Sequence, residues 1–135
     1  MKTFDDNEYT RWMNQADHTY QSAINDKNNN DFNWSCFKSQ QAAEFAIKAL
    51  LYGLGHTPFG HSLIRLLNEV QNMGTDPSSI LSCARILDRH YVPARYPNSY
   101  STGSPFEYYD KAAADEALQC AKKIIDFIQT QKGNS

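Results

Sequence analysis

The sequence lacks a charge excess of either sign. Its 13 basic and 15 acidic residues give a formal net charge of -2, so no bulk field draws the protein onto nucleic acid and any anion site must be assembled locally by folding. No apolar run approaches the ~18 residues that a membrane span needs. The first residues, MKTFDDNEYTRW, have neither the apolar core of a signal peptide nor an Arg-rich transit pattern. We therefore expect neither secretion nor membrane insertion.

Cysteine is scarce and widely spaced. Cys36, Cys83 and Cys120 lie far apart, each in a segment patterned like the apolar face of a helix, and there is no CxxC motif. This arrangement favours three buried free thiols over a disulfide framework or a zinc knuckle. Free thiols are typical of a reducing compartment, so we expect a cytoplasmic protein.

The motifs of familiar covalent and phosphate-cradling chemistries are absent. The chain contains no G-x-S-x-G, no Walker loop and no Gly-rich dinucleotide turn. None of its four histidines forms the i,i+4 pair with acidic support that a helical zinc site shows. We therefore expect no metal, no cofactor and no catalytic nucleophile.

Helical periodicity fills most of the chain, and nothing alternates with period two for long enough to form a strand. Caps, prolines and glycines divide the helical pattern. The predicted helices run from Tyr9 to Ile24, from the Asn-rich stretch 27–31 to Gly53 or Gly55, from Ser62 to Gly74, from Asp76 to about Pro93, and from Asp110 onward. The fold class is therefore all-α: an up-and-down bundle of four long helices plus a shorter fifth. We expect one domain, 1–135, with a core of about 9–130.

Polar residues on the second helix share one face. Gln41, Glu44 and Lys48 are spaced by three and four, and Glu44 and Lys48 form an i,i+4 pair in the favourable order. Spacing alone favours an ordinary surface ion pair worth a few tenths of a kcal/mol. His61 stands beside Ser62, where capping of the third helix and anchoring of the loop are favoured over a direct role in binding.

The stretch RYPNSY, residues 95–100, holds an arginine between prolines and tyrosines. Prolines at 93 and 97 restrict the backbone on both sides, so the arginine is presented at low entropic cost. A guanidinium beside tyrosine rings suits phosphate and stacked bases. The candidate binding residues here are Tyr91, Arg95, Tyr96, Asn98 and Tyr100. The alternative is a helix terminator in which Arg95 pairs with Glu44 and the tyrosines plug the end of the bundle.

Four segments in series resemble the HEPN domain, over about Arg11 to Ile128. These are SQQAAEFAIKALLYGLG, GHSLIRLL, ARILDRHYVPARYPNSY and DEALQCAKKIIDFI. The resemblance implies an all-α bundle, a homodimer, and a cleft near the arginine loop associated with nucleotides or RNA. It also implies an operon partner, a minimal nucleotidyltransferase, in a pair that acts as toxin and antitoxin in several lineages.

The sequence departs from the ribonuclease pattern of that family, in which a histidine follows the arginine after four to six residues. Arg95 matches the arginine, but positions 100 to 102 are Tyr, Ser and Thr. A tyrosine with a pKa near 10 is a poor proton donor or acceptor at neutral pH compared with imidazole. The resemblance also makes Tyr96 and Tyr100 candidate acceptors of adenylylation, which nucleotidyltransferases perform near this motif in some toxin pairs.

These considerations predict a non-catalytic binding and interaction protein for a nucleotide, RNA or nucleotidyltransferase partner. The alternative is a divergent metal-independent ribonuclease in which dimerisation brings His90 or His61 of either chain to Arg95. The full set of candidate binding residues is Arg95, Tyr96, Asn98, Tyr100, Tyr91, Lys48, Glu44 and His61.

Overall fold

Three long helices form the body of the structure, a computed structural model that describes residues 3–133. They are α1 (Asp6–Asn28), α2 (Phe32–Gly53) and α6 (Lys111–Gly133). Shorter helices are α3 (Leu63–Asn72), α4 (Leu81–Asp88) and α5 (Pro105–Tyr108), with 3-10 turns at η1 (Ser78–Ile80) and η2 (Pro97–Ser99). No strand occurs in residues 3–133.

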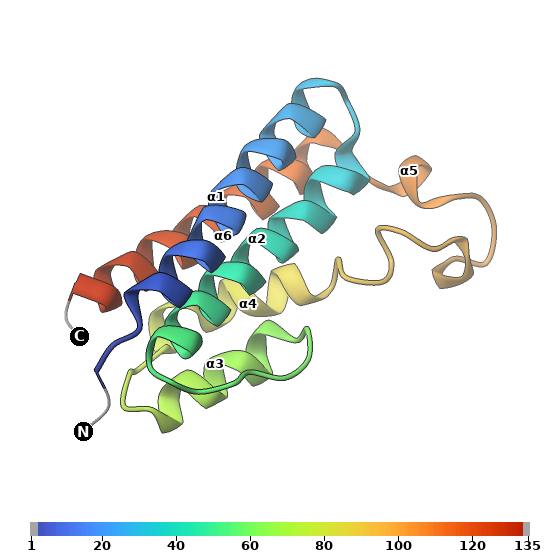
Figure 1. Ribbon diagram of the computed structural model, residues 1–135. Helices are drawn as coiled ribbons and strands as arrows, with labels where there is room; N and C mark the ends of the chain where they lie inside the picture. The colour runs from blue at the N-terminus through green and yellow to red at the C-terminus, as the bar shows by residue number, and fades with distance from the viewer. Residues whose placement is uncertain (1–2, 134–135) are drawn as a thin grey trace.

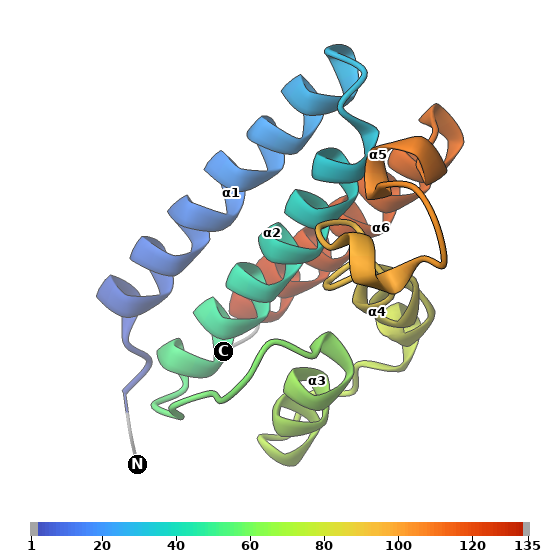
Figure 2. The ribbon, with the colours of Figure 1, turned by 90° about the vertical axis from the view of Figure 1, so that its right-hand side faces the viewer.

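Helix α2 is the centre of the bundle, because it packs along both α1 and α6 (Figures 1 and 2). Its alanines at 42, 43, 46 and 49 are all fully buried, as is typical of a helix that is apolar on most sides. The pair α3 and α4 covers the remaining side, with α4 also against α6. The start of α1 meets the end of α6, where Lys132 pairs with Asp6 at 3.2 Å.

The structure confirms the all-α bundle, both ends of α2 and α3 and the start of α6, whereas α1 extends beyond the predicted Tyr9–Ile24 at both ends. Ser62 caps α3 by accepting a hydrogen bond from the Arg65 N–H at 3.3 Å, and Asp110 accepts one from the Ala113 N–H at 2.9 Å as α6 begins. The lengths differ from four long helices: α1, α2 and α6 have 23, 22 and 23 residues, whereas α3 has 10 and α4 has 8.

The fourth helix is shorter than predicted at both ends. At its start, the Asp76 carboxylate accepts from the Ser78 N–H at 3.0 Å and opens the 3-10 turn η1 instead of an α-helix. At its end, α4 stops at Asp88, and residues 89–95 continue as successive turns. The expected loop 94–109 also contains η2 and the single-turn helix α5.

The cysteines correct one expectation. Cys83 on α4 and Cys120 on α6 form a disulfide, with Cα atoms 4.9 Å apart, so the prediction of three free thiols is wrong. Packing of α4 against α6 brings together two residues 37 positions apart, which no local pattern reveals. Cys36 alone is a free thiol, and burial raises its pKa to about 12. The disulfide also removes the premise from which a cytoplasmic location was expected.

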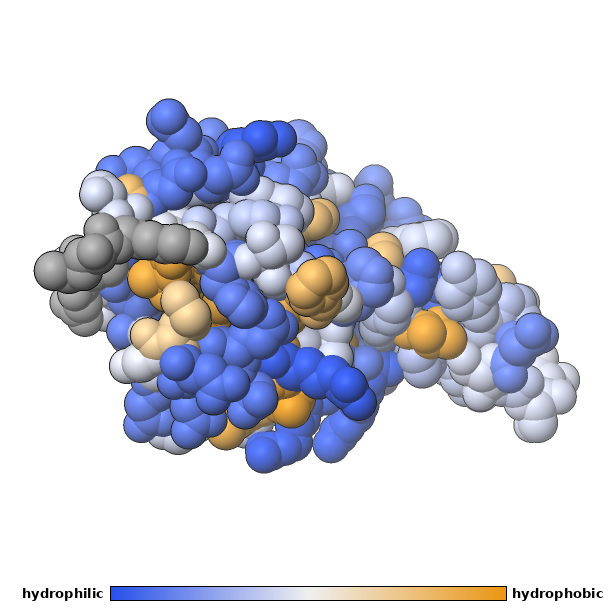
Figure 3. Space-filling view, turned by 60° about the horizontal axis from the view of Figure 1, so that its bottom comes forward, coloured by the Kyte–Doolittle hydropathy of each residue, from blue (hydrophilic) through white to orange (hydrophobic). Residues whose placement is uncertain are grey.

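The surface is divided into small patches. On the face shown in Figure 3, apolar residues appear as separate spots among polar ones, and the segment that contains η2 and α5 projects as a paler lobe. Residues 96–106 carry no charged side chain. None of the helices within residues 3–133 combines the length and the apolarity needed to cross a bilayer.

Candidate functional site

The arginine of the loop is held over aromatic rings. The Arg95 Cζ lies 4.3 Å from the centroid of the Phe37 ring, 4.6 Å from that of Tyr91 and 4.9 Å from that of Tyr96. Its Nε–H donates to the Tyr91 carbonyl at 2.8 Å. Each cation–π contact at a partly exposed site is worth about 0.5–1 kcal/mol. These contacts fix the guanidinium in place while leaving its charge uncompensated.

No carboxylate within residues 3–133 pairs with Arg95, and only its Nε–H has an acceptor there. The alternative in which Arg95 pairs with Glu44 is therefore wrong, because the carboxylate of Glu44 is engaged elsewhere. The side chain is half-buried, and its terminal N–H groups are left for an acceptor from outside the chain. A guanidinium in this state can donate two parallel hydrogen bonds to a phosphate.

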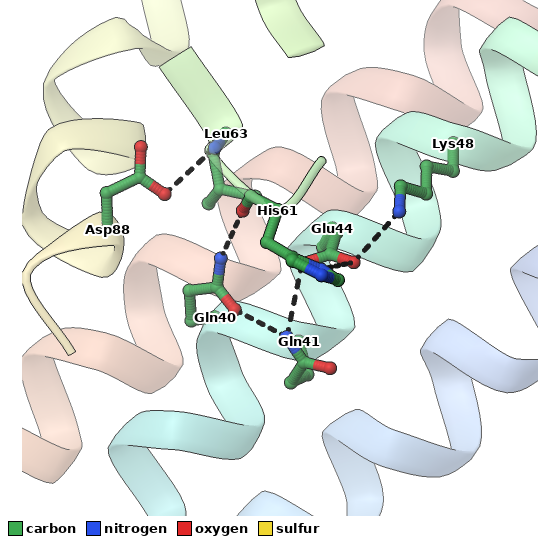
Figure 4. Close-up of polar contacts among 7 residues, drawn as sticks. All are labelled: Gln40, Gln41, Glu44, Lys48, His61, Leu63 and Asp88. Carbon is green, nitrogen blue, oxygen red and sulfur yellow. Dashed lines mark hydrogen bonds and ion pairs between the residues drawn. The ribbon is translucent and has the colours of Figure 1, made fainter. Parts of the chain in front are cut away.

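Glu44 is the centre of a polar network on α2 (Figure 4). Its Oε2 accepts from Lys48 Nζ at 3.1 Å and lies 3.1 Å from His61 Nδ1, while Oε1 accepts from Gln41 Nε2 at 3.2 Å. Only 3% of the Glu44 side chain is exposed. The pair Glu44–Lys48 is therefore a buried ion pair, and the interpretation as an ordinary surface pair is wrong.

His61 connects this network to the arginine. Its ring stacks on that of Tyr91, with centroids 5.1 Å apart and planes inclined by 17°. Its backbone carbonyl accepts from Gln40 Nε2 at 2.8 Å and holds the loop before α3, and 57% of its side chain is exposed. The expected capping of α3 by His61 is not seen, because Ser62 and Asp88 accept from its first N–H groups. His61 and Tyr91 also line an open groove of about 680 Å³ between the start of α3 and residues 88–93.

The remaining loop candidates are distributed unevenly. Tyr96 lies under the guanidinium and is exposed. Tyr100 turns away: its hydroxyl donates to the Pro93 carbonyl at 2.9 Å, and its ring stacks on Tyr108 with centroids 4.2 Å apart. Asn98 is exposed in η2 and contacts none of the other candidates. The structure thus brings together six of the eight candidates and separates Asn98 and Tyr100.

Two residues that position the site were not singled out from the sequence. Phe37 belongs to the apolar pattern of the second helix, and the centroid of its ring lies 4.3 Å from the Arg95 Cζ. Asp88 ends α4 and caps α3: its Oδ1 accepts from the Leu63 N–H at 2.8 Å, and its Oδ2 accepts from the Ile64 N–H at 3.2 Å. An acidic residue in the last turn of a helix opposes the helix dipole. Because the sequence predicts that this helix continues to about Pro93, the unfavourable position of Asp88 was not visible as a signal.

His90 lies apart from the arginine. Its Nδ1 is 2.9 Å from the Tyr109 hydroxyl, and the two ring centroids are 5.3 Å apart. Burial, together with the nearby charge of Arg89, lowers the pKa of His90, and burial raises the pKa of Tyr109. His90 is therefore a neutral structural imidazole at pH 7 in this chain.

Acidification is expected to destabilise the protein through His90. The unfolded imidazole takes up a proton below about pH 6.5, whereas the folded one resists protonation, so the unfolded state binds more protons and stability falls as the pH drops below that value. The loss is complete once the pH passes the lowered folded pKa. Urea unfolding between pH 7.5 and 5 should show a smaller loss for His90→Gln than for the unchanged protein. Parallel pH profiles would contradict this prediction.

The protein is an all-α helical bundle that carries an arginine-bearing loop after its fourth helix. The family model of the HEPN domain matches residues 9–131 of the sequence, and the chain belongs to this family. A protein of Methanocaldococcus jannaschii named "Putative toxin MJ1304" is 29% identical over 104 residues, which are 70% of this chain and 68% of that protein.

Solved structures agree with this assignment. TT1696 from Thermus thermophilus superposes with a TM-score of 0.88 and 35% identity, covering 92% of this chain and 98% of that one. ST0689, an archaeal HEPN homologue, superposes with a TM-score of 0.78 and 37% identity, covering 97% and 98%. The fold class predicted from the sequence is therefore that of solved members of the family.

Proposed function

We propose that the protein is a non-catalytic binding module that receives a phosphate of a nucleotide or RNA at Arg95. The observation that carries this proposal is the state of the guanidinium, which is fixed over three rings and has no carboxylate partner within residues 3–133. An unpaired cation positioned in this way costs little further entropy when an anion arrives. Lys48 is linked to Tyr91 through contacts, because Glu44 pairs with both Lys48 and His61 and the His61 ring stacks on Tyr91.

The loop offers no proton-transfer group in the ribonuclease position. Positions 100 to 102 are Tyr, Ser and Thr, and the hydroxyl of Tyr100 already donates to the Pro93 carbonyl. Metal-independent cleavage of RNA requires a group that takes a proton from the attacking hydroxyl near pH 7. Binding without cleavage is therefore the activity that we assign to the loop.

A homodimer paired with a minimal nucleotidyltransferase in a toxin–antitoxin-like system is part of the same proposal. Membership in the HEPN family and a relative that bears the name of a toxin support it. Co-expression with the product of an adjacent small nucleotidyltransferase gene, followed by size-exclusion chromatography and intact-mass spectrometry, would test the homodimer and the complex with the nucleotidyltransferase. Of the two candidate acceptors of adenylylation, Tyr96 is the exposed one, so Tyr96→Phe should remove any mass increase of one adenylyl group.

Replacement of Arg95 by alanine is expected to weaken binding of labelled tRNA or ATP by about 10- to 100-fold, the cost of losing a charge-assisted hydrogen bond to phosphate. Arg95→Lys should recover part of the affinity, because lysine keeps the charge without the bidentate fork. Arg85→Ala removes an exposed arginine from α4 and serves as the matched control. Equal affinities of the Arg95→Ala and Arg85→Ala proteins would contradict the proposal.

A divergent ribonuclease is the second candidate function. It is favoured by one observation: the half-exposed imidazole of His61 is oriented by the buried Glu44 carboxylate and stacks on Tyr91, which in turn contacts Arg95. Incubation of the protein with labelled tRNA and mRNA in EDTA tests this candidate. Cleavage that is lost in both His61→Ala and Arg95→Ala would replace the binding proposal with the enzymatic one.

A further inference from the structure

A second depression, separate from the groove lined by His61 and Tyr91, has Arg95 in its lining. It has a volume of about 350 Å³ and is lined, among others, by Asp31, Asn33, Trp34, Arg95, Pro105 and Phe106. We call it the Trp34 hollow. Its walls come from residues 30–34, at the start of α2, and from the segment 95–106, so residues more than 60 positions apart meet there. The volume is at the small end of ligand sites, which span about 300–1,000 Å³.

A buried hydrogen bond connects the two segments that line the hollow. The Asn33 Nδ2 donates to the Ala94 carbonyl at 3.0 Å, and both residues are buried. This bond ties the first turn of α2 to the residue before Arg95. The position of Arg95 relative to Trp34 is therefore set before any ligand binds.

Large aromatic surfaces are left open at the hollow. Trp34 is 43% exposed and Phe106 is 69% exposed, although burial of each ring would be favourable. The edge of Trp34 contacts Phe37, with centroids 6.2 Å apart and planes at 82°, and Phe37 carries the guanidinium of Arg95. Aromatic rings that can stack on a base thus lie next to a guanidinium that can donate hydrogen bonds to a phosphate. This combination binds unpaired nucleotides.

The carboxylate of Asp31, which also lines the hollow, can accept hydrogen bonds from the edge of a base. Asp31 occupies the N-cap position of α2 but makes no side-chain capping bond, and its carboxylate has no partner within residues 3–133. A carboxylate can only accept hydrogen bonds, and its two oxygens match two adjacent N–H donors. Among the RNA bases, guanine presents such a pair on its Watson–Crick edge, whereas uracil presents one donor between two carbonyl acceptors.

We infer that the Trp34 hollow binds one unpaired nucleotide of a single-stranded RNA and prefers guanine to uracil. The phosphate binds Arg95, the base stacks on the more exposed ring, that of Phe106, and Asp31 accepts hydrogen bonds from the base edge. This inference rests on the proposed function, because it uses the same arginine. It extends that function by naming the class of RNA and the residues that read it.

Fluorescence anisotropy with labelled hexamers tests the inference. The protein should bind UUGUUU at least about 5-fold more tightly than UUUUUU, and should bind UUGUUU annealed to its complement more weakly than the single strand. Phe106→Ala should weaken binding of UUGUUU by about 5- to 100-fold, the range for loss of a base-stacking ring. Phe59→Ala removes a ring that is 78% exposed outside the hollow and should leave the affinity unchanged.

Asp31→Asn should make the affinities for UUGUUU and UUUUUU equal, whatever the change in absolute affinity. Asparagine is as good as aspartate at an N-cap, so this variant should fold normally. Binding that depends on Arg95 but not on Phe106, or that shows no base preference, would overturn the inference and leave the proposed function intact. Tighter binding of the duplex would do the same. Absence of any binding to RNA and ATP would overturn both.

Discussion

Replacement of Lys48 by methionine is expected to lower the free energy of unfolding by about 3 kcal/mol, the lower end of the cost of removing one partner from a buried ion pair. Its partner Glu44 exposes only 3% of its side chain, so water does not replace the lost interaction. The cost stays at the lower end because the half-exposed His61 still lies against the same carboxylate oxygen. Urea unfolding followed by circular dichroism measures the change.

The chain provides a matched control in an exposed pair with the same spacing. Lys122 lies 2.9 Å from Asp126 on the solvent face of α6, and Lys122→Met should change the stability far less than Lys48→Met, because water screens the exposed pair. Adding Glu44→Gln to Lys48→Met should restore part of the stability, because the amide is neutral and keeps its hydrogen-bonding capacity. Equal losses in Lys48→Met and Lys122→Met would show that Glu44 is solvated in solution.

The contrast between these two pairs shows what spacing can and cannot predict. Both pairs are visible in the sequence as charges four residues apart, and nothing local distinguishes them. Glu44 is buried because the loop before α3 folds over it, and that loop is positioned through the Gln40 bond to the His61 carbonyl. Burial of Glu44 is therefore a long-range property that could not be predicted from its own helix.

Helix positions could be predicted well where local signals act alone. Ser62 and Asp110 mark the starts of α3 and α6 because each side chain caps its own first turn. The end of α4 could not be predicted, because Asp88 uses its carboxylate for the N-terminus of α3. A sequence pattern that describes one helix at a time cannot show that a residue of one helix caps another.

The position of the loop arginine beside tyrosine rings could be predicted from the sequence, and its role in binding stays a prediction. Two prolines around an arginine and several tyrosines predicted a guanidinium held beside aromatic rings, and the structure places Arg95 over Tyr91 and Tyr96. The third ring, Phe37, comes from α2, whose apolar pattern is the same whether a ring faces the core or the loop. Trp34 in the wall of the hollow could not be predicted for the same reason, because it also belongs to the apolar pattern of α2.

Loss of the disulfide is expected to lower the free energy of unfolding by about 3–4 kcal/mol, the chain-entropy value for a loop of this length. Cys83 and Cys120 are 37 residues apart, and their bond joins α4 to α6. For a domain of this size the loss corresponds to a decrease in melting temperature of roughly 10 °C. Thermal unfolding of the oxidised protein, with and without a reductant such as TCEP, measures the effect.

Variants of the three cysteines separate the bond from other effects of a reductant. The Cys36→Ala protein should keep its response to TCEP, whereas Cys83→Ala combined with Cys120→Ala should melt at the same lowered temperature with or without it. Thiol titration in denaturant should find one reactive thiol per oxidised chain and three after reduction, because Cys36 is the free cysteine. Three thiols in the oxidised protein, or a melting temperature indifferent to reductant, would contradict the bond.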